Sequence, residues 1–200
     1  MKKLIIASIC FFFVIGVKAQ SGAVGFTYGL FAGTTSTDIS TNIDYDDKTS
    51  GAGFTVGAFS RFKVLFLTIQ PEIAYSKNNV TLTANDGGNL YQAKLSSDIF
   101  EINGLINLLG ISLGDAVKLR LPIGVGYSID MGSTIDFNGS KTEATNTVGT
   151  YFNGLAGLGI DVLGLTADFR YRFGFSDIVE GSAVDITPNV FVFTLGYKFR

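Results

Sequence analysis

One short run of the sequence, ADFRYRFGF at 167–175, alternates charged and aromatic side chains almost without a break. In an extended strand successive side chains face opposite ways, so Asp168, Arg170 and Arg172 would share one face and the rings between them the other. Water suits the charges and an apolar solvent suits the rings. The run therefore predicts a strand that separates two different environments.

The same two-residue period recurs along most of the chain. In the segment 116–131, the odd positions from Val117 to Ile129 are large and apolar, whereas the even positions from Lys118 to Asp130 are small, polar or charged. Each such segment is long enough to be one strand of a sheet. We predict eight strands, at 22–33, 52–62, 65–77, 94–108, 116–131, 150–162, 163–176 and 189–200.

The composition indicates which kind of sheet these strands form. Only 16% of the residues are charged, against about 25% in an ordinary soluble domain, and the mean hydropathy is +0.35. After the first twenty residues there is no run of about 18 apolar residues that could form a spanning helix. The apolar faces carry bulky rings while the opposite faces carry Gly, Thr, Ser and charge, which inverts the pattern of a soluble barrel. The sequence therefore predicts an all-β protein, an eight-stranded antiparallel up-and-down transmembrane β-barrel.

The connections between the predicted strands alternate in length, as in outer-membrane barrels with tight periplasmic turns and long external loops. Two long connections contain ANDGGN and FNG, and Asn-Gly or Asp-Gly steps favour tight reversals. We therefore expect those two loops to continue as hairpins above the membrane. The short links are 63–64, 109–115 and 162–164, and the long ones are 34–51, 78–93, 132–149 and 177–188.

Aromatic residues are expected near both ends of the barrel, where an interfacial belt would lie. Towards the short turns these are Phe62, Tyr197 and Phe199. Towards the long loops they are Tyr75, Tyr127, Tyr151, Phe173, Phe175 and Phe191.

The N-terminus has the pattern of a secretory signal. A basic start precedes the uncharged stretch 4–17, and Val17 and Ala19 suit a cut before Gln20. We predict a signal peptide at 1–19 and a barrel domain at 20–200; the alternative, an anchoring helix, is disfavoured by the short run. The only cysteine, Cys10, lies in the leader, so residues 20–200 hold no Cys, His or Trp. Without histidine a Ser-His-Asp triad cannot form, and we predict a protein that is not an enzyme and has no cofactor.

The charged residues on the inward side of the predicted barrel nearly balance, with six basic and five acidic side chains. Buried charge is tolerated when it is paired and hydrogen-bonded, and eight strands leave no wide channel. The pattern predicts a lumen closed by a salt-bridge network, with a gated ion path or a binding site as the alternative. The residues are Arg61, Glu72, Glu101, Lys118, Arg120, Asp130, Asp161, Asp168, Arg170, Arg172 and Lys198.

An acidic cluster lies in the first long connection. Asp44, Asp46 and Asp47 could offer carboxylate oxygens to a cation such as Ca²⁺. The loop lacks the glycine and the late Glu of an EF-hand, so the favoured interpretation is a hydrated external loop and no metal site.

Three stretches carry a resemblance to a known family: TIQPEIAYSK (68–77), DIFEINGLINLL (98–109) and LRLPIGVGYSID (119–130). They resemble the outer-membrane β-barrel family common in Bacteroidota, often labelled PorT-like, with OmpA/OmpX-sized barrels. The resemblance implies an eight-stranded barrel in the cell outer membrane of a Gram-negative bacterium. It implies no single activity.

The expected function is therefore a non-enzymatic surface barrel with a structural or adhesive role. The alternative is a PorT-like component of a secretion or transport assembly. Either protein is expected to be a monomer that contacts outer-membrane lipid, binds protein partners through its external loops and binds no nucleic acid.

Overall fold

The computed structural model describes residues 24–41, 47–64, 67–86, 89–114, 116–137, 140–143, 149–175 and 186–199. The predicted signal peptide and the core of the first and last long loops lie outside these residues. None of the described residues belongs to a helix long and apolar enough to cross a membrane. The strands are β1 (Val24–Thr41), β2 (Asp47–Val64), β3 (Leu67–Asp86), β4 (Asn89–Leu113), β5 (Val117–Phe137), β6 (Ser140–Glu143), β7 (Thr150–Val162), β8 (Leu165–Gly174) and β9 (Ile186–Phe199).

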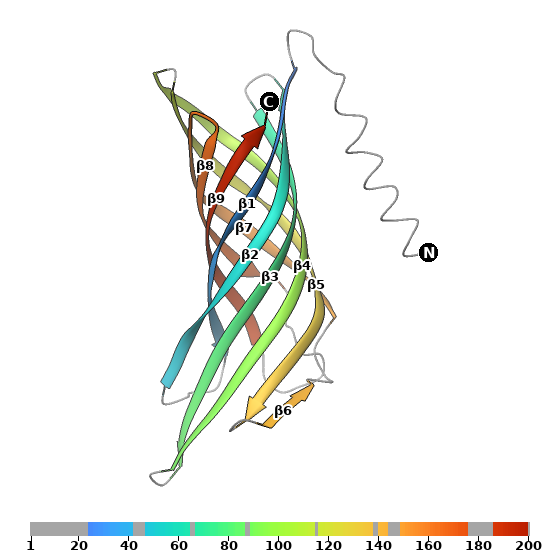
Figure 1. Cartoon of the computed structure of the whole chain (residues 1–200), viewed down its shortest axis with the longest axis vertical. Helices are drawn as coiled ribbons and strands as arrows, with labels where there is room; N and C mark the ends of the chain where they lie inside the picture. Colours follow the sequence, from blue (N-terminus) through green and yellow to red (C-terminus); the bar gives the residue numbers. More distant parts are fainter. Residues whose placement is uncertain are drawn as a thin grey trace, which may run out of the picture.

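Eight of these strands close into a barrel, which confirms the predicted fold (Figure 1). The antiparallel order is β4-β3-β2-β1-β9-β8-β7-β5, and a further β4–β5 pairing closes the ring. The short strand β6 pairs only with β5, beyond the barrel wall. Closure leaves no open sheet edge, and an open edge would leave backbone amides unsatisfied in hydrocarbon.

Six of the eight barrel strands are longer than predicted, chiefly at the external ends, whereas β7 has the predicted bounds and β8 is shorter than the predicted 163–176. β3 and β4 remain paired from Ser76–Ile99 to Asp86–Asn89, a projection of roughly 34 Å at about 3.4 Å per residue. β7 and β8 stop much earlier, so the wall is tall over β3–β5 and low over β7–β8. The structure confirms that both long connections continue as hairpins, β3–β4 and β5–β6.

Burial follows the predicted alternation. On β8 the charged residues Asp168, Arg170 and Arg172 are buried, whereas the outward ring of Phe169 is 52% exposed. In a membrane that exposed face is the lipid-facing one. Strand β8 thus separates a charged lumen from an apolar exterior.

The interior also contains an apolar layer, so the predicted inner face of Gly, Thr, Ser and charge was incomplete. Phe31 and Phe59 lie inside the barrel with their ring centroids 6.4 Å apart, and Leu105 and Leu155 are buried as well. Tyr151, expected in the interfacial belt, is buried in the lumen instead. Its odd position on β7 shares the inward face of Asp161, so the belt assignment was wrong.

Glycine makes room for these inner rings. A Cβ placed on Gly29 would lie 2.5 Å from the Phe59 ring and 2.3 Å from the carbonyl oxygen of Tyr197. We expect Gly29→Ala to lower the free energy of unfolding by about 1–3 kcal/mol, as overpacking of a filled core does. The control is Gly104→Ala, because a Cβ on Gly104 meets nothing within 4 Å. Urea titration in phospholipid vesicles measures both, and equal losses would contradict the tight packing of Phe59 against Gly29.

Candidate functional site

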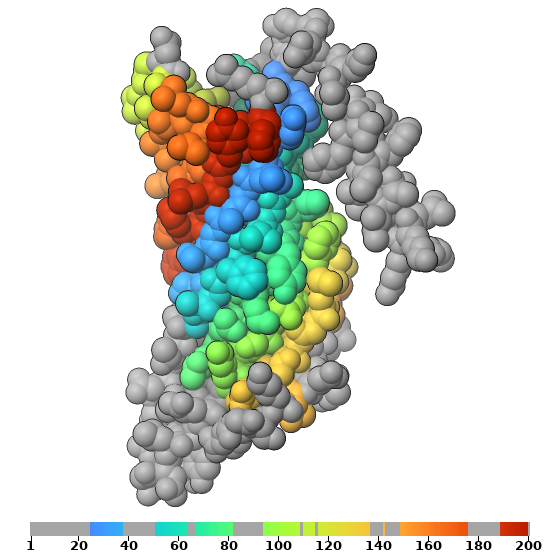
Figure 2. Space-filling view, viewed as in Figure 1, coloured from blue at the N-terminus to red at the C-terminus, as the bar shows by residue number. Residues whose placement is uncertain are grey.

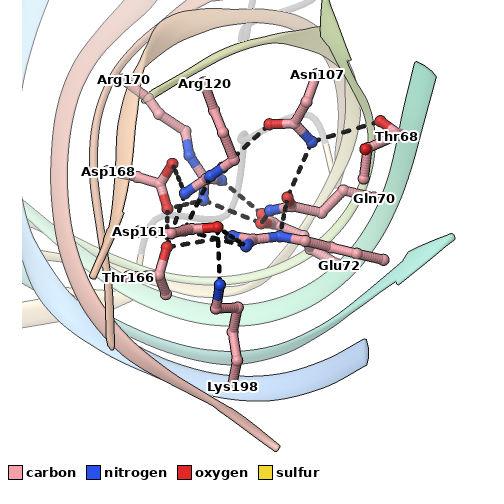
Figure 3. A network of polar contacts seen from close by, with 11 residues as sticks. Thr68, Gln70, Glu72, Asn107, Arg120, Asp161, Thr166, Asp168, Arg170 and Lys198 are labelled. Atoms are coloured by element: carbon pink, nitrogen blue, oxygen red, sulfur yellow. Dashed lines mark hydrogen bonds and ion pairs between the residues drawn. The ribbon is translucent and has the colours of Figure 1, made fainter. Parts of the chain in front are cut away.

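The half of the lumen nearer the short turns is organised around one carboxylate, that of Asp161 on β7 (Figure 3). Asp161 accepts hydrogen bonds from Arg61 on β2 (3.0 Å), from Arg120 on β5 (3.0 Å) and from Lys198 on β9 (2.9 Å). Four strands distributed around the barrel therefore meet at a single acidic side chain. Such charge-assisted bonds are stronger than neutral ones.

Arg120 extends this cluster along the barrel. Its guanidinium donates to Asp168 (2.9 Å), to Thr166 (2.7 Å) and to the amide oxygen of Asn107 (3.0 Å). With the bond to Asp161, each of its three nitrogens has an acceptor. These hydrogen bonds offset the cost of burying the Arg120 guanidinium.

A glutamine connects the Asp161 cluster to the middle of the lumen. Gln70 accepts hydrogen bonds from Arg61 (2.6 Å) and Asn107 (3.1 Å), and its own amide donates to Glu72 (2.6 Å). All four side chains are buried. Gln70 thus links the cationic side of the cluster to the next carboxylate.

In the middle of the barrel, Glu72 and Arg170 form a two-pronged pair. The two guanidinium nitrogens of Arg170 lie 2.6 and 2.9 Å from the two carboxylate oxygens of Glu72. Arg170 also lies 3.5 Å from Asp168, and its guanidinium carbon lies 6.0 Å from the centre of the Phe31 ring. The pair bridges β3 and β8, on opposite sides of the barrel.

Towards the external end, Arg172 forms an ion pair with Glu101. The gap that Glu72, Glu101, Arg170 and Arg172 help to line has a volume of ≈10 Å³. That is about the space needed for one water molecule. The lumen is therefore filled by side chains at this level.

The structure brings nine of the eleven predicted lumen charges into ion pairs, five of them basic and four acidic. Their salt bridges all lie inside the barrel, and every acidic member has at least one cationic partner. The nine are Arg61, Glu72, Glu101, Arg120, Asp161, Asp168, Arg170, Arg172 and Lys198.

The other two predicted members, Lys118 and Asp130, stand apart. Lys118 is half-buried, and no described carboxylate lies within ion-pair distance of its ammonium. Asp130 is half-buried beside a bulge at which β4 and β5 change register, and it accepts from the Gly132 amide (2.9 Å) and the Ser133 hydroxyl (2.8 Å). A bulge redirects side chains, and here the Asp130 carboxylate contacts its chain neighbours Gly132 and Ser133 instead of the network.

The network also contains neutral members that were not singled out from the sequence: Gln70, Asn107 and Thr166. Each shares its strand's inward parity with a charged residue, so parity could have found them. An aromatic contact was missed as well, with the Arg61 guanidinium 4.6 Å from the centre of the Phe59 ring.

The candidate cation loop cannot be placed. Asp44 and Asp46 lie outside the described residues, and the side chain of Asp47 is not described either. Elsewhere in the described part of the chain, no group of three or more potential ligand side chains could hold a metal ion.

A closed eight-stranded barrel with an apolar exterior and a charged, filled lumen is the architecture of small outer-membrane proteins. Residues 18–180 match the family model described as an outer membrane protein beta-barrel domain. The chain belongs to this family. Membership indicates the outer membrane of a Gram-negative bacterium, whereas the Bacteroidota origin, the PorT-like type and the cleavage of a signal peptide stay predictions.

Solved structures agree on the fold. The outer membrane protein OprG from Pseudomonas aeruginosa is 14% identical with a TM-score of 0.51, over 90% of this chain and 98% of OprG. Ail, the attachment invasion locus protein of Yersinia pestis, solved with the heparin analogue sucrose octasulfate, is 12% identical with a TM-score of 0.50, over 87% of this chain and 99% of Ail. A comparison with curated proteins gives no match.

Proposed function

We propose that this member of the outer-membrane barrel family is a non-enzymatic surface protein that presents external loops and hairpins for adhesion. The observation that carries the proposal is the filled lumen. The gap between the central pair Glu72–Arg170 and the outer pair Glu101–Arg172 measures ≈10 Å³, about the space of one water molecule, which supports a closed lumen. What remains available for function is the external end.

The lumen chemistry also argues against catalysis. The buried carboxylates of Glu72, Glu101, Asp161 and Asp168 are each engaged by an arginine. A general base needs a carboxylate that a substrate can reach. These four carboxylates hold the barrel walls together instead.

The external end carries a net negative charge. The connections and adjoining strand ends at 34–51, 78–93, 132–149 and 177–188 carry two basic residues, Lys48 and Lys141. Such a surface attracts cationic partners and repels polyanions. The acidic residues there are Asp38, Asp44, Asp46, Asp47, Asp86, Asp136, Glu143, Asp177, Glu180 and Asp185.

The adhesive role gains support from the name of Ail, an attachment protein on the same fold. The partner chemistry should differ, however, because Ail was solved with a highly sulfated ligand. An acidic rim would repel such a ligand. We infer that the partner of this chain is a basic segment of a protein or another cationic surface polymer.

This function predicts a charge-selective surface. Purified barrel in neutral detergent should bind polylysine-coated beads and not heparin-coated beads. Replacing Asp44, Asp46 and Asp47 together by Asn should weaken polylysine binding by roughly tenfold, if each exposed charge contributes about 0.5 kcal/mol. Bead retention at several salt concentrations measures the effect, and the far-ultraviolet dichroism of the variant controls for folding.

The alternatives give different results. Retention that does not depend on the three carboxylates would contradict the acidic adhesive rim. Reproducible co-purification of tagged barrel with secretion components from native membranes would favour the transport-assembly role instead.

A further inference from the structure

The outward face of β3 and β4 changes from apolar to polar over a few successive cross-strand pairs. Ile73 pairs with Ile102, Tyr75 with Phe100, Lys77 with Asp98, and Asn79 with Ser96. Aromatic rings favour the interface between hydrocarbon and headgroups, and charges favour the headgroup side. The hydrocarbon boundary on this side therefore lies between the Tyr75–Phe100 pair and the Lys77–Asp98 pair.

An apolar hollow lies on the hydrocarbon side of this boundary. It is an open depression with a volume of ≈430 Å³ and an almost entirely apolar lining. Its cause is the small side chain of Ala58 on β2, which is paired with Leu30 on β1 and Ile73 on β3. Val56, Tyr75 and Phe100 line its external side. Figure 2 turns this face, β1 to β4, towards the viewer.

Polar groups at the external rim of the hollow are held in place. The Tyr75 hydroxyl donates to Asp98 (2.7 Å), and the Lys77 ammonium lies 3.3 Å from the same carboxylate. The Lys77 side chain stays 40% exposed. An ammonium has three donors, so the contact with Asp98 leaves Lys77 able to bind an anion from outside the barrel.

The depth of the hollow in the membrane indicates which kind of molecule occupies it. At this depth the solvent is acyl chains, and an unfilled hollow would forfeit dispersion contacts along its lining. The cation stands just above the hollow on the same strand, about 7 Å from the Tyr75 row at 3.4 Å per residue. That spacing matches an amphiphile whose anionic group and chain are adjacent.

We propose that the Ala58 hollow and Lys77 form a binding site for one phosphate-bearing lipid of the external leaflet. One acyl chain occupies the hollow against Leu30, Ile73 and Phe100. The phosphate binds the Lys77 ammonium. Asp98, held by Tyr75, keeps that ammonium at the rim.

Native mass spectrometry of the full chain, released from detergent micelles, tests the site with three matched probes. These are phosphatidylglycerol, diacylglycerol with the same chains, and glycerol phosphate without chains. We expect retention of one phosphatidylglycerol, about tenfold weaker retention of diacylglycerol, and none of glycerol phosphate.

Variants separate the two halves of the site. Ala58→Phe fills the hollow and should lower phosphatidylglycerol retention about tenfold, with Ala58→Leu as the substitute if the phenylalanine variant fails to fold. Lys77→Gln should remove the preference for phosphatidylglycerol over diacylglycerol, and Lys77→Arg should restore it. The control Ala167→Phe changes an outward alanine on β8, between Ile160 and Leu195, and should leave retention unchanged.

Three results would overturn the proposal. The first is equal retention by the Ala58→Phe and Ala167→Phe proteins, and the second is equal retention of phosphatidylglycerol and diacylglycerol by the unmodified chain. The third is a dimer that Ala58→Phe dissociates, because the occupant would then be a second copy of the barrel.

Discussion

Asp161→Asn is expected to cost about 3–5 kcal/mol of the free energy of unfolding, the usual loss when one partner of a buried charge cluster is removed. The neutral amide would leave Arg61, Arg120 and Lys198 facing one another without a shared carboxylate. The strands β2, β5 and β9 would lose the contact that links each of them to β7, so the substitution weakens the interactions that hold the closed barrel together. Urea-dependent unfolding in phospholipid vesicles, followed by the mobility shift between folded and unfolded barrel on gels, measures it.

Asp130→Asn provides the matched control. Asp130 has the same inward parity, but among the described residues its carboxylate accepts hydrogen bonds only from the nearby Gly132 and Ser133. An asparagine keeps one acceptor for these contacts, so we expect a loss below about 1 kcal/mol. Equal losses at Asp161 and Asp130 would show that the shared carboxylate is not what stabilises the barrel.

Asp161 and Asp130 show which features of the lumen could be predicted from the sequence. Alternation predicts the inward or outward direction of a side chain, because the pleat of a strand is local and regular. It placed both aspartates on the inward face. It could not detect the extra residue at the β4–β5 bulge, since the register shift depends on how two separate strands pair.

Partners across the lumen were beyond the reach of sequence for a related reason. Arg61 and Asp161 are 100 residues apart, and they meet through the combined registers of all the strands between them. A barrel's stagger is a property of the closed sheet. Parity therefore yields the list of inward charges, whereas closure decides which of them touch.

The predicted external strand ends and the predicted position of Tyr151 were wrong for other physical reasons. β3 and β4 continue past the predicted limits at 77 and 94, because the more polar residues beyond Lys77 still pair across the two strands. Tyr151 was assigned to the belt by its height along the strand alone. An aromatic residue belongs to the interfacial belt only if its position along the strand is near the interface and its side chain also points outward.

The central pair Glu72–Arg170 predicts strong coupling. Arg170→Met alone would leave the Glu72 carboxylate buried with only the Gln70 amide as donor, and should cost about 3–5 kcal/mol. Combining it with Glu72→Gln removes both charges, and the double variant should recover much of the loss. Unfolding of the four proteins in a double-mutant cycle gives the coupling, and additive losses would show that the two side chains do not act as a pair.

The same pair predicts how the lumen conducts. The unmodified protein in planar bilayers should show no steady current at modest voltage, because the ion pairs leave a gap of only ≈10 Å³. Truncating both sides with Glu72→Ala and Arg170→Ala removes side-chain volume between Phe31 and the outer pair, which water would fill because Gln70, Asp168 and Arg172 remain around it. Small-ion current should then be measurable. Steady current through the unmodified barrel would mean that the ion pairs line a path instead of closing it.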